Sequence, residues 1–431
     1  MNVQQALEYI NGTSRFGSKP GLEIIGLLME KLGNPQDDLK FIHVAGTNGK
    51  GSTCAFIASI LQAQGYKTGL YISPYVDVFN ERIQINRQYI PDEELAKATE
   101  KVKEKADEII AEGKRSPTIF ELVTAVALLY FQKEKCDYVV WETGLGGRLD
   151  ATNIVKTTLC AVITNIGYDH TAILGNTLSQ IAFEKAGIIK NGIDVVLYRQ
   201  TDEVEEVIRK VCRERQANLY IADFDDIEVT ESSLSGYTFN KGSFKGLRIS
   251  LLGEHQLKNA SVALTACRCL IRQGVVISED SIRKGFMNAK WQARAEIVRE
   301  KPMYMVDAGH NPQCAQALKD MVDKHFPGIR PVYIYGSLID KDYQAVSEIL
   351  FSDAKAVITV STKGERGLTA QDLGETVKNY CKQVFPHDTI KDAMRFCKNY
   401  VSDHDLVIVF GSLTFLDEAR KEIIDIYKEG R

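Results

Sequence analysis

A glycine-rich segment between an apolar run and a helix-like run constrains this chain more than any other feature. The segment reads His43-Val44-Ala45-Gly46-Thr47-Asn48-Gly49-Lys50-Gly51-Ser52-Thr53. It follows the apolar residues 41–45 and leads into a helical pattern over residues 53–64. Strand, glycine-rich turn and helix start form the context of a phosphate-binding loop in an α/β fold. The helix start supplies a positive dipole end, and a lysine reaches the terminal phosphates.

We therefore predict ATP as the ligand of this loop, held by the backbone and side chains of Thr47, Asn48, Gly49, Lys50, Gly51, Ser52 and Thr53. The spacing departs from the usual pattern, which places a glycine at Val44 and a hydroxyl residue directly after the lysine. Here Gly51 follows the lysine and the hydroxyl comes one position later, at Ser52. The segment alone leaves open a strand–helix turn without a ligand.

Length and charge narrow the class of protein. A chain of 431 residues is too long for one core and long enough for two well-buried domains. Hydrophobic residues make up 44% and charged residues 26%, which is typical of a globular protein. The formal net charge of −4 gives no electrostatic footprint for nucleic acid or an anionic membrane. We expect neither as a partner.

The cysteines and the N-terminus indicate a cytoplasmic protein. Nine cysteines are scattered along the chain, and only Cys267 and Cys269 lie close together, with no second pair to complete a zinc site. Several lie in apolar runs, where thiols behave as small hydrophobic groups, as is usual in a reducing compartment. Residues 1–10 show no basic region followed by an apolar core, and no apolar run approaches the length of a membrane span.

Strand-like apolar runs alternate with helical patterns over most of the chain. This alternation predicts an α/β fold with a mainly parallel sheet that helices cover on both faces. The expected strands are Phe41–Ala45, Thr68–Ile72, Tyr138–Trp141, Leu159–Asn165 and Val195–Tyr198. The expected helices include Asp92–Glu112, Ile119–Glu134 and Leu178–Ile189.

Two later regions break this pattern. Short segments between residues 227 and 252 predict a small antiparallel sheet, followed by a helix over Asn259–Gln273. After Pro302 the alternation restarts with strands at Met303–Val306, Val332–Tyr335, Ala356–Val360 and Leu406–Phe410. We predict two domains: residues 1–296, a P-loop-type domain with the small antiparallel sheet, and residues 297–431, a Rossmann-like α/β domain.

Polar residues follow several of the predicted strands. Ser73 and Glu142 each end an apolar run, and Asp169-His170 come shortly after another. Ligands of open parallel sheets lie beyond the carboxyl ends of the strands, and a carboxylate there commonly binds Mg²⁺. Singly, Glu142 is equally interpreted as a helix cap or surface carboxylate, and His170 as a structural or solvated histidine.

Three further segments have competing interpretations. Thr118-Ile119-Phe120-Glu121 forms a capping box, which is compatible with Phe120 presenting its ring to a ligand. Asn311-Pro312, at the end of Asp307-Ala308-Gly309-His310-Asn311, suits a helix cap and first turn. Gly411-Ser412 follows an apolar run in the same way. Each segment singly is also explained as a helix start.

With these motifs assembled, the chain resembles the folylpolyglutamate synthase and dihydrofolate synthase branch of the Mur ligase family, nearly end to end. The run Glu142-Thr143-Gly144-Leu145-Gly146-Gly147-Arg148-Leu149-Asp150-Ala151-Thr152-Asn153 is the most specific part of the resemblance. The resemblance also includes His43–Thr53, Ser73-Pro74, Phe79–Ile83, Thr118–Glu121, Asp169-His170, Leu174-Gly175, Glu184–Lys190, His255-Gln256, Asn259-Ala260 and Gly411-Ser412.

The resemblance implies roles at the nucleotide and metal sites. Asn259, Arg294 and Asp307 would complete the ATP site. Mg²⁺ would be bound through Ser52, Ser73, Glu142, His170 and Lys185, with Lys50, His170 and Lys185 as catalytic residues. Lys185 matches a lysine that the family carbamylates, a modification that turns a cation into an oxygen ligand for a hard metal.

The resemblance also implies a substrate site. The pterin pocket would use Thr118, Ile119, Phe120, Glu121, Leu149, Asp150 and Ala151, with Gly21, Leu22 and Glu23 closing over it. The incoming glutamate would be bound by His310 and Ser412 of the second domain, together with Arg82.

Two positions depart from the family pattern. The family usually reads Trp-Pro-Gly-Arg where this chain has Trp291-Gln292-Ala293-Arg294. It reads Asp-Gly-Ala-His-Asn-Pro where this chain has Asp307-Ala308-Gly309-His310-Asn311-Pro312. The backbone path is therefore in question at both places.

The implied activity is ATP-dependent ligation of L-glutamate to folates through an acyl phosphate, with small-molecule substrates and a monomeric enzyme. The form of Gly147–Ala151 favours a bifunctional enzyme that also joins dihydropteroate to glutamate; folylpolyglutamate synthesis alone is the alternative.

A cell-wall amino-acid ligase of the same superfamily would need a further domain before the loop, where roughly forty residues stand. A nucleotide-dependent regulatory switch is a third possibility, against which His310 and Ser412 argue.

Overall fold

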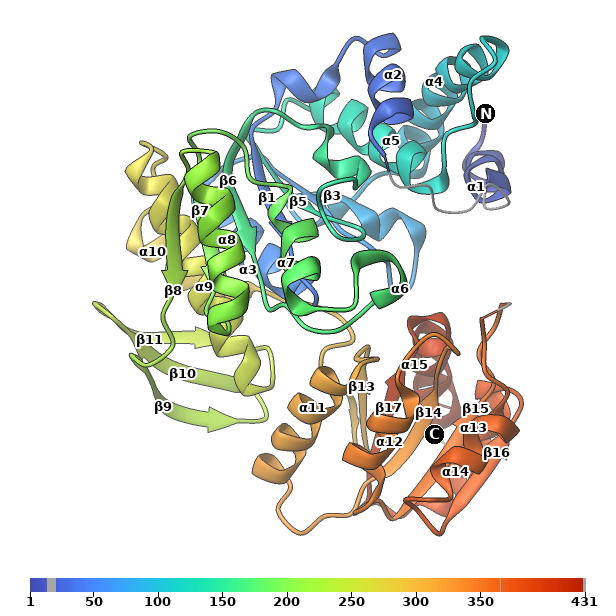
Figure 1. Cartoon of the computed structure of the whole chain (residues 1–431). Coiled ribbons are helices and arrows are strands. Elements are labelled where there is room, and N and C mark those ends of the chain that lie inside the picture. Colours follow the sequence, from blue (N-terminus) through green and yellow to red (C-terminus); the bar gives the residue numbers. More distant parts are fainter. Residues whose placement is uncertain (14–20, 365, 429–431) are drawn as a thin grey trace. The chain divides into compact units, whose positions relative to one another are not determined.

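Parallel strands form the centre of each of two structural units. The computed structural model describes residues 1–13, 21–364 and 366–428. The first unit comprises residues 1–228, 239–249 and 258–289, and the second comprises residues 229–238, 250–257 and 290–431. In each unit, helices flank a central sheet (Figure 1). The predicted domain boundary at residue 296 stays a prediction.

The first unit contains an eight-stranded sheet in the order β4-β3-β2-β5-β1-β6-β7-β8. Strands β2, β5, β1, β6, β7 and β8 are parallel, and β3 and β4 add an antiparallel edge. The strands are β1 (Phe41–Ala45), β2 (Thr68–Tyr71), β3 (Ile83–Ile85), β4 (Gln88–Tyr89), β5 (Tyr138–Glu142), β6 (Thr158–Ile163), β7 (Asp194–Tyr198) and β8 (Asn218–Ala222). The strand order reverses direction around β1, which is where open α/β sheets place their ligands.

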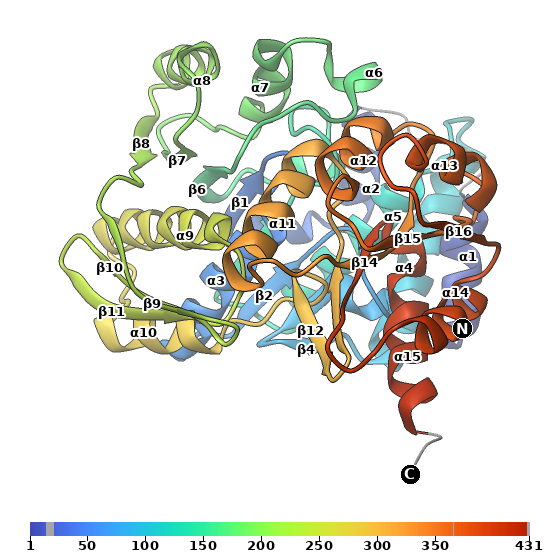
Figure 2. The ribbon, with the colours of Figure 1, turned by 90° about the horizontal axis from the view of Figure 1, so that it is seen from below.

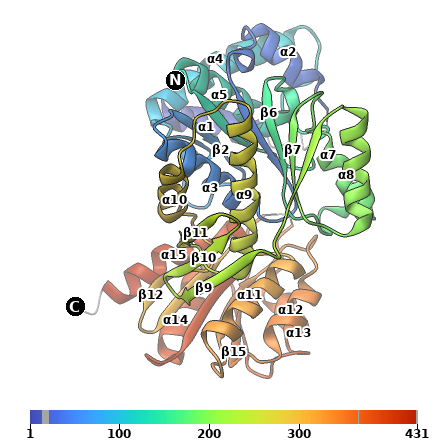
Figure 3. The same cartoon turned by 90° about the vertical axis from the view of Figure 1, so that its left-hand side faces the viewer.

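Helices cover both faces of this sheet. Around β6 and β7, α7 and α8 lie on one face and α3 and α9 on the other (Figures 1 and 3). The helices are α1 (Val3–Gly12), α2 (Glu23–Lys31), α3 (Lys50–Ala63), α4 (Asp92–Ala111), α5 (Ile119–Lys133), α6 (Thr171–Leu174), α7 (Leu178–Ala186), α8 (Asp202–Glu214), α9 (Glu254–Arg272, from residue 258 on in this unit) and α10 (Glu279–Asn288), with 3₁₀ turns η2 (Pro35–Asp38), η3 (Phe79–Arg82) and η4 (Ala151–Ile154).

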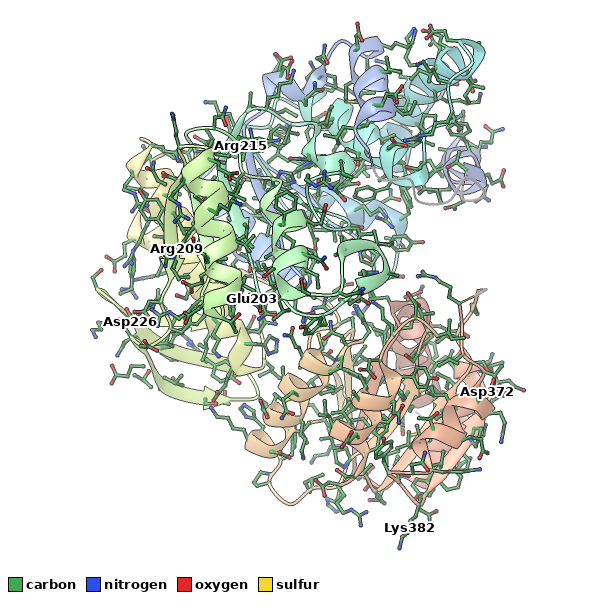
Figure 4. The ribbon with its side chains drawn as sticks, viewed as in Figure 1. Glu203, Arg209, Arg215, Asp226, Asp372 and Lys382 are labelled. Atoms are coloured by element: carbon green, nitrogen blue, oxygen red, sulfur yellow. The ribbon has the colours of Figure 1, made fainter. Side chains whose placement is uncertain are left out.

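Helix α8 shows why these segments are helical. Its apolar residues Val204, Ile208 and Cys212 recur at helical spacing and are buried. Charged side chains such as Glu203 and Arg209 project from the helix in Figure 4. The periodicity therefore fixes which face packs on the sheet.

A small antiparallel sheet joins strands β11, β10 and β9 in that order. Its strands are β9 (Ile227–Ser233), β10 (Gly236–Lys241) and β11 (Phe244–Ile249). Strand β11 lies beside α10 within the first unit (Figure 2). Alternating burial along β10 and β11 is typical of a sheet with one covered face.

The second unit has a six-stranded sheet in the order β12-β13-β17-β14-β15-β16. All neighbours are parallel except the edge strand β12, which is antiparallel to β13. Helices α11, α12 and α13 cover one face, and α14 and α15 cover the other (Figure 3). The elements are β12 (Glu296–Glu300), β13 (Met303–Asp307), α11 (Pro312–His325), β14 (Val332–Gly336), α12 (Tyr343–Phe351), β15 (Ala356–Val360), α13 (Ala370–Val377), β16 (Val384–His387), α14 (Ile390–Tyr400), β17 (Leu406–Gly411) and α15 (Leu413–Lys428).

Aromatic side chains fill the core beneath β1, β2 and β5. The rings of Tyr71 and Trp141 lie 4.3 Å apart between centroids, and Phe41 packs on Trp141 at 5.5 Å. All three side chains are fully buried. Each buried ring of this kind contributes about 2–3 kcal/mol through removal of apolar surface from water. This core therefore packs the start of β1 against the carboxyl ends of β2 and β5.

The structure confirms the predicted fold class, with a mainly parallel sheet, a small antiparallel sheet and a second α/β unit. Sequence patterns missed β3, β4, β8, β12 and β16. All five of these strands lie at or next to a sheet edge, where short and partly polar strands carry weak hydrophobic periodicity. Eight of the nine cysteines are buried. None of the described helices is long and apolar enough to cross a membrane.

Candidate active site

The loop that joins β1 to α3 lies at the carboxyl end of β1, which is between β5 and β6 in the sheet. Gly49 caps α3 with φ of 87°, a left-handed conformation that glycine adopts at low cost. A Cβ on Gly46 would lie 1.8 Å from Thr164 Oγ1, so only glycine fits between the loop and β6. The two glycines bring the backbone close to its neighbours, as a phosphate-binding loop requires.

Residues just after β6 hold this loop from the side. The backbone N–H groups of Thr47 and Asn48 donate to Asn165 O at 2.8 and 3.2 Å. The Thr47 hydroxyl donates to Gly167 O at 3.1 Å, and Thr164 Oγ1 donates to Asn48 O at 2.8 Å. The loop conformation is therefore set by its neighbour in the sheet rather than by its own sequence alone.

Two lysines converge on one carbonyl in this loop. Lys50 Nζ donates to Gly46 O at 3.1 Å, and Lys185 Nζ, from the last turn of α7, donates to the same oxygen at 2.9 Å. Burial, with the nearby Lys50 charge as a second cause, lowers the pKa of Lys185 from 10.5 to about 7. Near neutral pH a large share of Lys185 is therefore a neutral amine, the form that reacts as a nucleophile.

The first turn of α3 presents buried hydroxyls. Ser52 and Thr53 are both buried, and Thr53 Oγ1 has no hydrogen-bond partner among the described residues. Asn259 of α9 approaches the same turn, because a Cβ on Gly49 would lie 2.5 Å from Asn259 Oδ1. The structure thus brings Asn259 to the loop, as predicted for the nucleotide site.

Glu142 ends β5 as a buried carboxylate. Its side chain is 4% exposed, so the alternative of a surface carboxylate is wrong. Glu142 Oε2 accepts a hydrogen bond from the backbone N–H of Ser73 at 3.2 Å. The Ser73 hydroxyl in turn accepts a hydrogen bond from Arg82 at 3.2 Å. Three predicted site residues from β5, the end of β2 and η3 therefore form one group.

Arg82 is held by aromatic rings. Its guanidinium lies 5.1 Å from the centroid of the Tyr75 ring and 5.7 Å from that of Phe79. The neighbouring Glu81 accepts backbone N–H groups of Val76, Asp77 and Val78 at 2.8–2.9 Å. These contacts order the segment that carries both Ser73 and Arg82.

His170 lies at the edge of this region. It has φ of 50° at the N-cap of α6, and its side chain is 37% exposed. Its Nε2 lies 3.8 Å from Asp169 Oδ1. The Asp169 charge in turn acts to raise the pKa of Lys185. His170 therefore stands beside a carboxylate that is electrostatically coupled to the buried lysine.

The donor set fits Mg²⁺ rather than a tightly caged transition metal. No group of three or more His, Cys, Asp or Glu side chains forms a metal site within the described ranges. Hydroxyls and one or two carboxylates, completed by water and substrate phosphates, are the usual ligands of Mg²⁺. Ser52, Ser73 and Glu142 offer this chemistry, and the orphan hydroxyl of Thr53 leaves a further polar atom for a ligand at the same turn.

The predicted pterin segments form a second group. The Phe120 ring packs over Gly144, where a Cβ would lie 2.5 Å from the ring. The ring of Tyr71 lies 6.1 Å away. The predicted capping box at Thr118 and Glu121 is confirmed.

The Glu121 carboxylate is already engaged by its neighbours. It also accepts two hydrogen bonds of 2.8 Å from Arg115. With the capping bonds included, Glu121 orients this segment and presents Phe120.

Asp150 lies within the glycine-rich turn that follows β5. Its Oδ2 accepts the N–H groups of Gly144 and Leu145 at 3.1 and 2.8 Å, and its Oδ1 accepts the backbone N–H of Thr152 at 3.0 Å and the Thr152 hydroxyl. Burial raises the pKa of Asp150, and these hydrogen bonds oppose the rise. Three of the four partners are backbone N–H groups, which can only donate, and the four hydrogen bonds together fill the acceptor sites of the carboxyl group.

Neighbouring backbone completes this group. Gly21 N donates to Leu149 O at 3.2 Å, which brings the predicted closing segment, including Leu22 and Glu23, to the pterin segment. Ala151 begins η4 and is buried, and Ile119 begins α5 and packs against the same core. The structure therefore brings the predicted pterin residues together within the first unit.

The same turn packs tightly on the end of α7. A Cβ on Gly187 would lie 2.3 Å from Arg148 Cα, and one on Gly147 would lie 2.9 Å from the Glu184 and Lys185 carbonyls. Arg148 also donates to Glu184 Oε1 at 2.8 Å. These contacts end α7 at Ala186, earlier than the predicted Ile189, and position Lys185 against the loop.

The remaining predicted residues belong to the second unit. Asp307 Oδ1 accepts Gly309 N at 2.7 Å, and its Oδ2 accepts Ala295 N at 2.8 Å. Burial raises the pKa of Asp307, whereas the charges of Arg294 and His310 act to lower it. Arg294, Asp307 and His310 therefore lie together at the end of β13. That Arg294 and Asp307 complete the nucleotide site stays a prediction.

Ser412 follows β17, the strand next to β13. Its N–H donates to Gly336 O at 3.0 Å, at the end of β14. Since β13, β17 and β14 are parallel neighbours, their carboxyl ends lie at one edge of this sheet. This edge is the ligand-binding edge of an open α/β sheet. Asn311 caps α11 and Pro312 begins it, as predicted.

At both positions where the sequence departs from the family pattern, the local backbone accommodates the residues of this chain. Ala293 is buried with φ of 51°, a conformation that the usual glycine adopts without strain. At the second place a Cβ on Gly309 would lie 2.7 Å from both Cys314 Cβ and the Phe410 ring, so glycine is required at this position. The transposed small residues thus match the packing of this chain.

Sequence reasoning missed some residues of the first unit. Gly46 was seen as part of the loop, but not as the acceptor for both lysines; its place directly after β1 was the available signal. Thr164 lies in no motif, and His43 was seen only as the first residue of the glycine-rich segment, with no role assigned to its side chain. Both act through contacts with residues more than one hundred positions away.

Comparison with known proteins identifies the family. Residues 44–267 match the Mur ligase middle domain, and residues 293–413 match the Mur ligase glutamate ligase domain. This chain belongs to the Mur ligase family. Within the family it is 37% identical over 434 residues to dihydrofolate synthase/folylpolyglutamate synthase of Bacillus subtilis, covering 97% of this chain and 99% of the relative.

Solved structures of Mur ligase family members agree. A folylpolyglutamate synthase from Thermotoga maritima matches with a TM-score of 0.84 at 34% identity, covering 97% of this chain and 96% of the other. Escherichia coli FolC in complex with DHPP and ADP matches with a TM-score of 0.87 at 30% identity, covering 99% of both chains. Membership therefore extends along the whole chain and includes the folylpolyglutamate synthase and dihydrofolate synthase group.

Proposed function

We propose that this protein is an ATP-dependent ligase that adds L-glutamate to (poly)glutamyl folates and also joins dihydropteroate to glutamate. The observation that carries the proposal is the β1–α3 loop, in which Lys50 and Lys185 both donate a hydrogen bond to the carbonyl oxygen of Gly46. It lies in a chain that is similar end to end to a dihydrofolate synthase/folylpolyglutamate synthase. The ADP bound to the E. coli relative supports the nucleotide assignment.

A carboxylate is a poor electrophile, so the reaction needs activation. The γ-phosphoryl group of ATP passes to the substrate carboxylate, the glutamate amine attacks the resulting acyl phosphate, and phosphate leaves as the amide forms. Lys50 and the N–H groups of the α3 N-terminus bind the phosphates and neutralise charge. Catalysis is then largely positioning and electrostatic stabilisation.

Ser52, Ser73, Glu142 and His170 are the residues that we assign to Mg²⁺. When bound, Mg²⁺ neutralises the phosphate charge during transfer. The buried position of Glu142 and its hydrogen bond from Ser73 N hold a carboxylate in place for this purpose.

Lys185 is proposed to react with CO₂. Its neutral amine attacks the carbon of CO₂, a C–N bond forms, and one proton is released to solvent to leave a carbamate anion. The lowered pKa of about 7 supplies the neutral amine. The carbamate would replace a buried cation with an oxygen donor for the metal.

We assign the pterin ring to the wall formed by Phe120, Gly144 and the Leu149–Ala151 turn. The segment that begins at Gly21 lies next to this wall. Aromatic stacking on Phe120 and backbone polar groups of the turn suit a flat heterocycle. We assign glutamate to His310 and Ser412 of the second unit, because imidazole and hydroxyl groups bind carboxylates.

The experiment is a product analysis with purified protein. ATP, L-glutamate and Mg²⁺ are incubated with tetrahydrofolate and, separately, with dihydropteroate, and products are identified by mass spectrometry. We expect glutamylated product from both substrates, with one ADP released per amide bond. No product from dihydropteroate removes the second activity, which leaves folylpolyglutamate synthesis alone. No amide product from either substrate overturns the proposal.

A further inference from the structure

Three buried polar residues connect β1 to the turn that follows β5. His43 lies in the middle of β1, opposite Trp141 on one side and Ala161 on the other. Its Nε2 lies 3.1 Å from Thr152 Oγ1, and Thr152 Oγ1 lies in hydrogen-bond contact with Asp150 Oδ1. His43 and Thr152 are fully buried, and Asp150 is 7% exposed.

The direction of each hydrogen bond follows from the donors available. Three backbone N–H groups, which can only donate, bond to Asp150 and favour its carboxylate form, so the single hydrogen of the Thr152 hydroxyl points to Asp150. His43 must then donate to Thr152, which places its proton on Nε2. Nδ1 carries no hydrogen, is buried and has no partner among the described residues.

The surroundings keep His43 neutral. Burial lowers the pKa of His43 well below its usual value, and the positive charge of Lys190 acts in the same direction. Lys190 is itself held by the carbonyl and side chain of Asn153, the residue after Thr152, at 3.1 and 2.7 Å. The proton arrangement is therefore fixed by burial and charge together.

The chain of hydrogen bonds ends at the proposed pterin wall. Asp150 Oδ2 holds the N–H groups of Gly144 and Leu145, and Gly144 supports the face of the Phe120 ring. A second bond, from Trp141 Nε1 to Thr152 O at 3.0 Å, fixes the backbone of Thr152. The position of Gly144 against Phe120 thus depends on Thr152 and, through it, on His43.

We propose that His43 is a positioning residue for the pterin substrate, acting through Thr152 and Asp150 on the turn that faces Phe120. This inference rests on the proposed function, because it assigns the wall to a pterin. His43 does not touch the reacting atoms. It precedes the phosphate-binding loop by only three residues, yet its effect is on the pterin side of the site.

Four variants test the proposal. His43→Leu and Thr152→Val remove the donor and the hydroxyl, whereas His43→Gln and Thr152→Ser keep a donor and a hydroxyl near the same places. We expect the KM for tetrahydrofolate and dihydropteroate to rise about tenfold in His43→Leu and Thr152→Val, the loss of roughly one buried hydrogen bond. The KM for ATP should change by less than about twofold, and the two conservative variants should recover most of the loss.

The double variant His43→Leu/Thr152→Val sharpens the test. If the two residues act as one chain, its KM for the pterin substrate rises by about the same tenfold, not about a hundredfold. Thermal unfolding and ADP binding, measured by calorimetry, report whether each variant folds. If His43→Leu does not fold, the comparison of Thr152→Val with Thr152→Ser decides.

Three results would overturn the inference: an unchanged KM for pterin substrates in the folded variants, an equal rise in the KM for ATP, or a Thr152→Ser variant as impaired as Thr152→Val. In each case the wild-type enzyme still forms glutamylated product, so only the role of His43 fails. Absence of product from the wild-type enzyme would instead refute the proposed function on which the inference rests.

Discussion

Two turns, each at the carboxyl edge of the sheet in its unit, contain residues with positive φ. They differ in the conformational free energy that this backbone conformation costs. In the first unit the left-handed position before α3 is Gly49, and the close approach to β6 is made by Gly46. In the second unit Ala293 and Ala295 adopt φ of 51° and 46°, and glycine is reserved for the close approach at Gly309. A left-handed alanine costs about 1–2 kcal/mol, whereas glycine adopts this conformation freely.

The surroundings explain why the second turn persists. Ala293 N donates to Glu296 Oε2 at 2.8 Å, and Ala293 O accepts Ala308 N at 2.9 Å. Ala295 N donates to the buried Asp307. Strained backbone survives where neighbouring contacts determine it more strongly than local preference does. The turn before α3 in the first unit has glycine at its left-handed position, and beside it lies an unfavourable buried amine, Lys185.

The largest expected effect is at Lys50. Lys50→Met removes the cation that we assign to the terminal phosphates, and we expect kcat to fall about 100- to 1,000-fold with the protein still folded. Steady-state kinetics with varied ATP measure the effect. Lys210→Met, on the exposed side of α8, is the matched control and should be unchanged. Full turnover of Lys50→Met would refute the assignment.

Lys185 tests the buried charge of the first unit. Lys185→Met should lower activity about 100-fold, because the carbamate that we propose as a metal ligand cannot form. It should also raise stability, since a buried ammonium is removed. Because the folded pKa of about 7 lies below the usual 10.5, the unfolded chain binds more protons between these values, and wild-type stability rises with pH across that window.

The stability gain of Lys185→Met should therefore be greatest at and below pH 7 and shrink toward pH 10, which urea unfolding at several pH values measures. Carbamate formation on the wild-type protein should increase from pH 6 to pH 8, as ¹³C NMR with labelled bicarbonate would show. A gain that is independent of pH would contradict a lowered pKa at this residue.

Variants of Ser412 test whether the second unit binds glutamate rather than the nucleotide. Ser412→Ala should raise the KM for glutamate about tenfold through loss of a hydrogen bond to a charged substrate, and leave the KM for ATP unchanged. His310→Ala should do the same. Initial rates with each substrate varied in turn give the result. A rise in the KM for ATP alone would assign these residues to the nucleotide instead.

The smallest effect is at Ala293. Ala293→Gly removes the left-handed strain, and we expect the free energy of unfolding to rise by about 0.5–1 kcal/mol after the greater chain entropy of glycine is subtracted. Ala317→Gly, in the interior of α11, should lower it by about 1 kcal/mol. Thermal unfolding of both variants gives opposite shifts if the strain at Ala293 is real. Equal losses of stability would show that it is not.

Local patterns predicted much of the fold and part of the site. The Phe41–Ala45 strand, the Thr118 cap and the Asn311 cap all appear where the sequence placed them, because each depends on residues within one or two turns. The short strands β8 and β16 were missed because neither carries a clear apolar period. The alternative of a surface carboxylate at Glu142 failed because burial depends on which strand lies beside β5.

By itself, the sequence determined a parallel α/β architecture, a glycine-rich loop after β1 and the motifs that mark the family. These features depend on the spacing of residues close together in the sequence and on the chemistry of single residues. The tertiary structure alone decided that Lys50 and Lys185 share the Gly46 carbonyl, that four donors fill the Asp150 carboxylate, and that Ala293 takes a left-handed shape. These depend on close approach between segments distant in the chain, and contact, burial and charge there follow from packing rather than from local sequence.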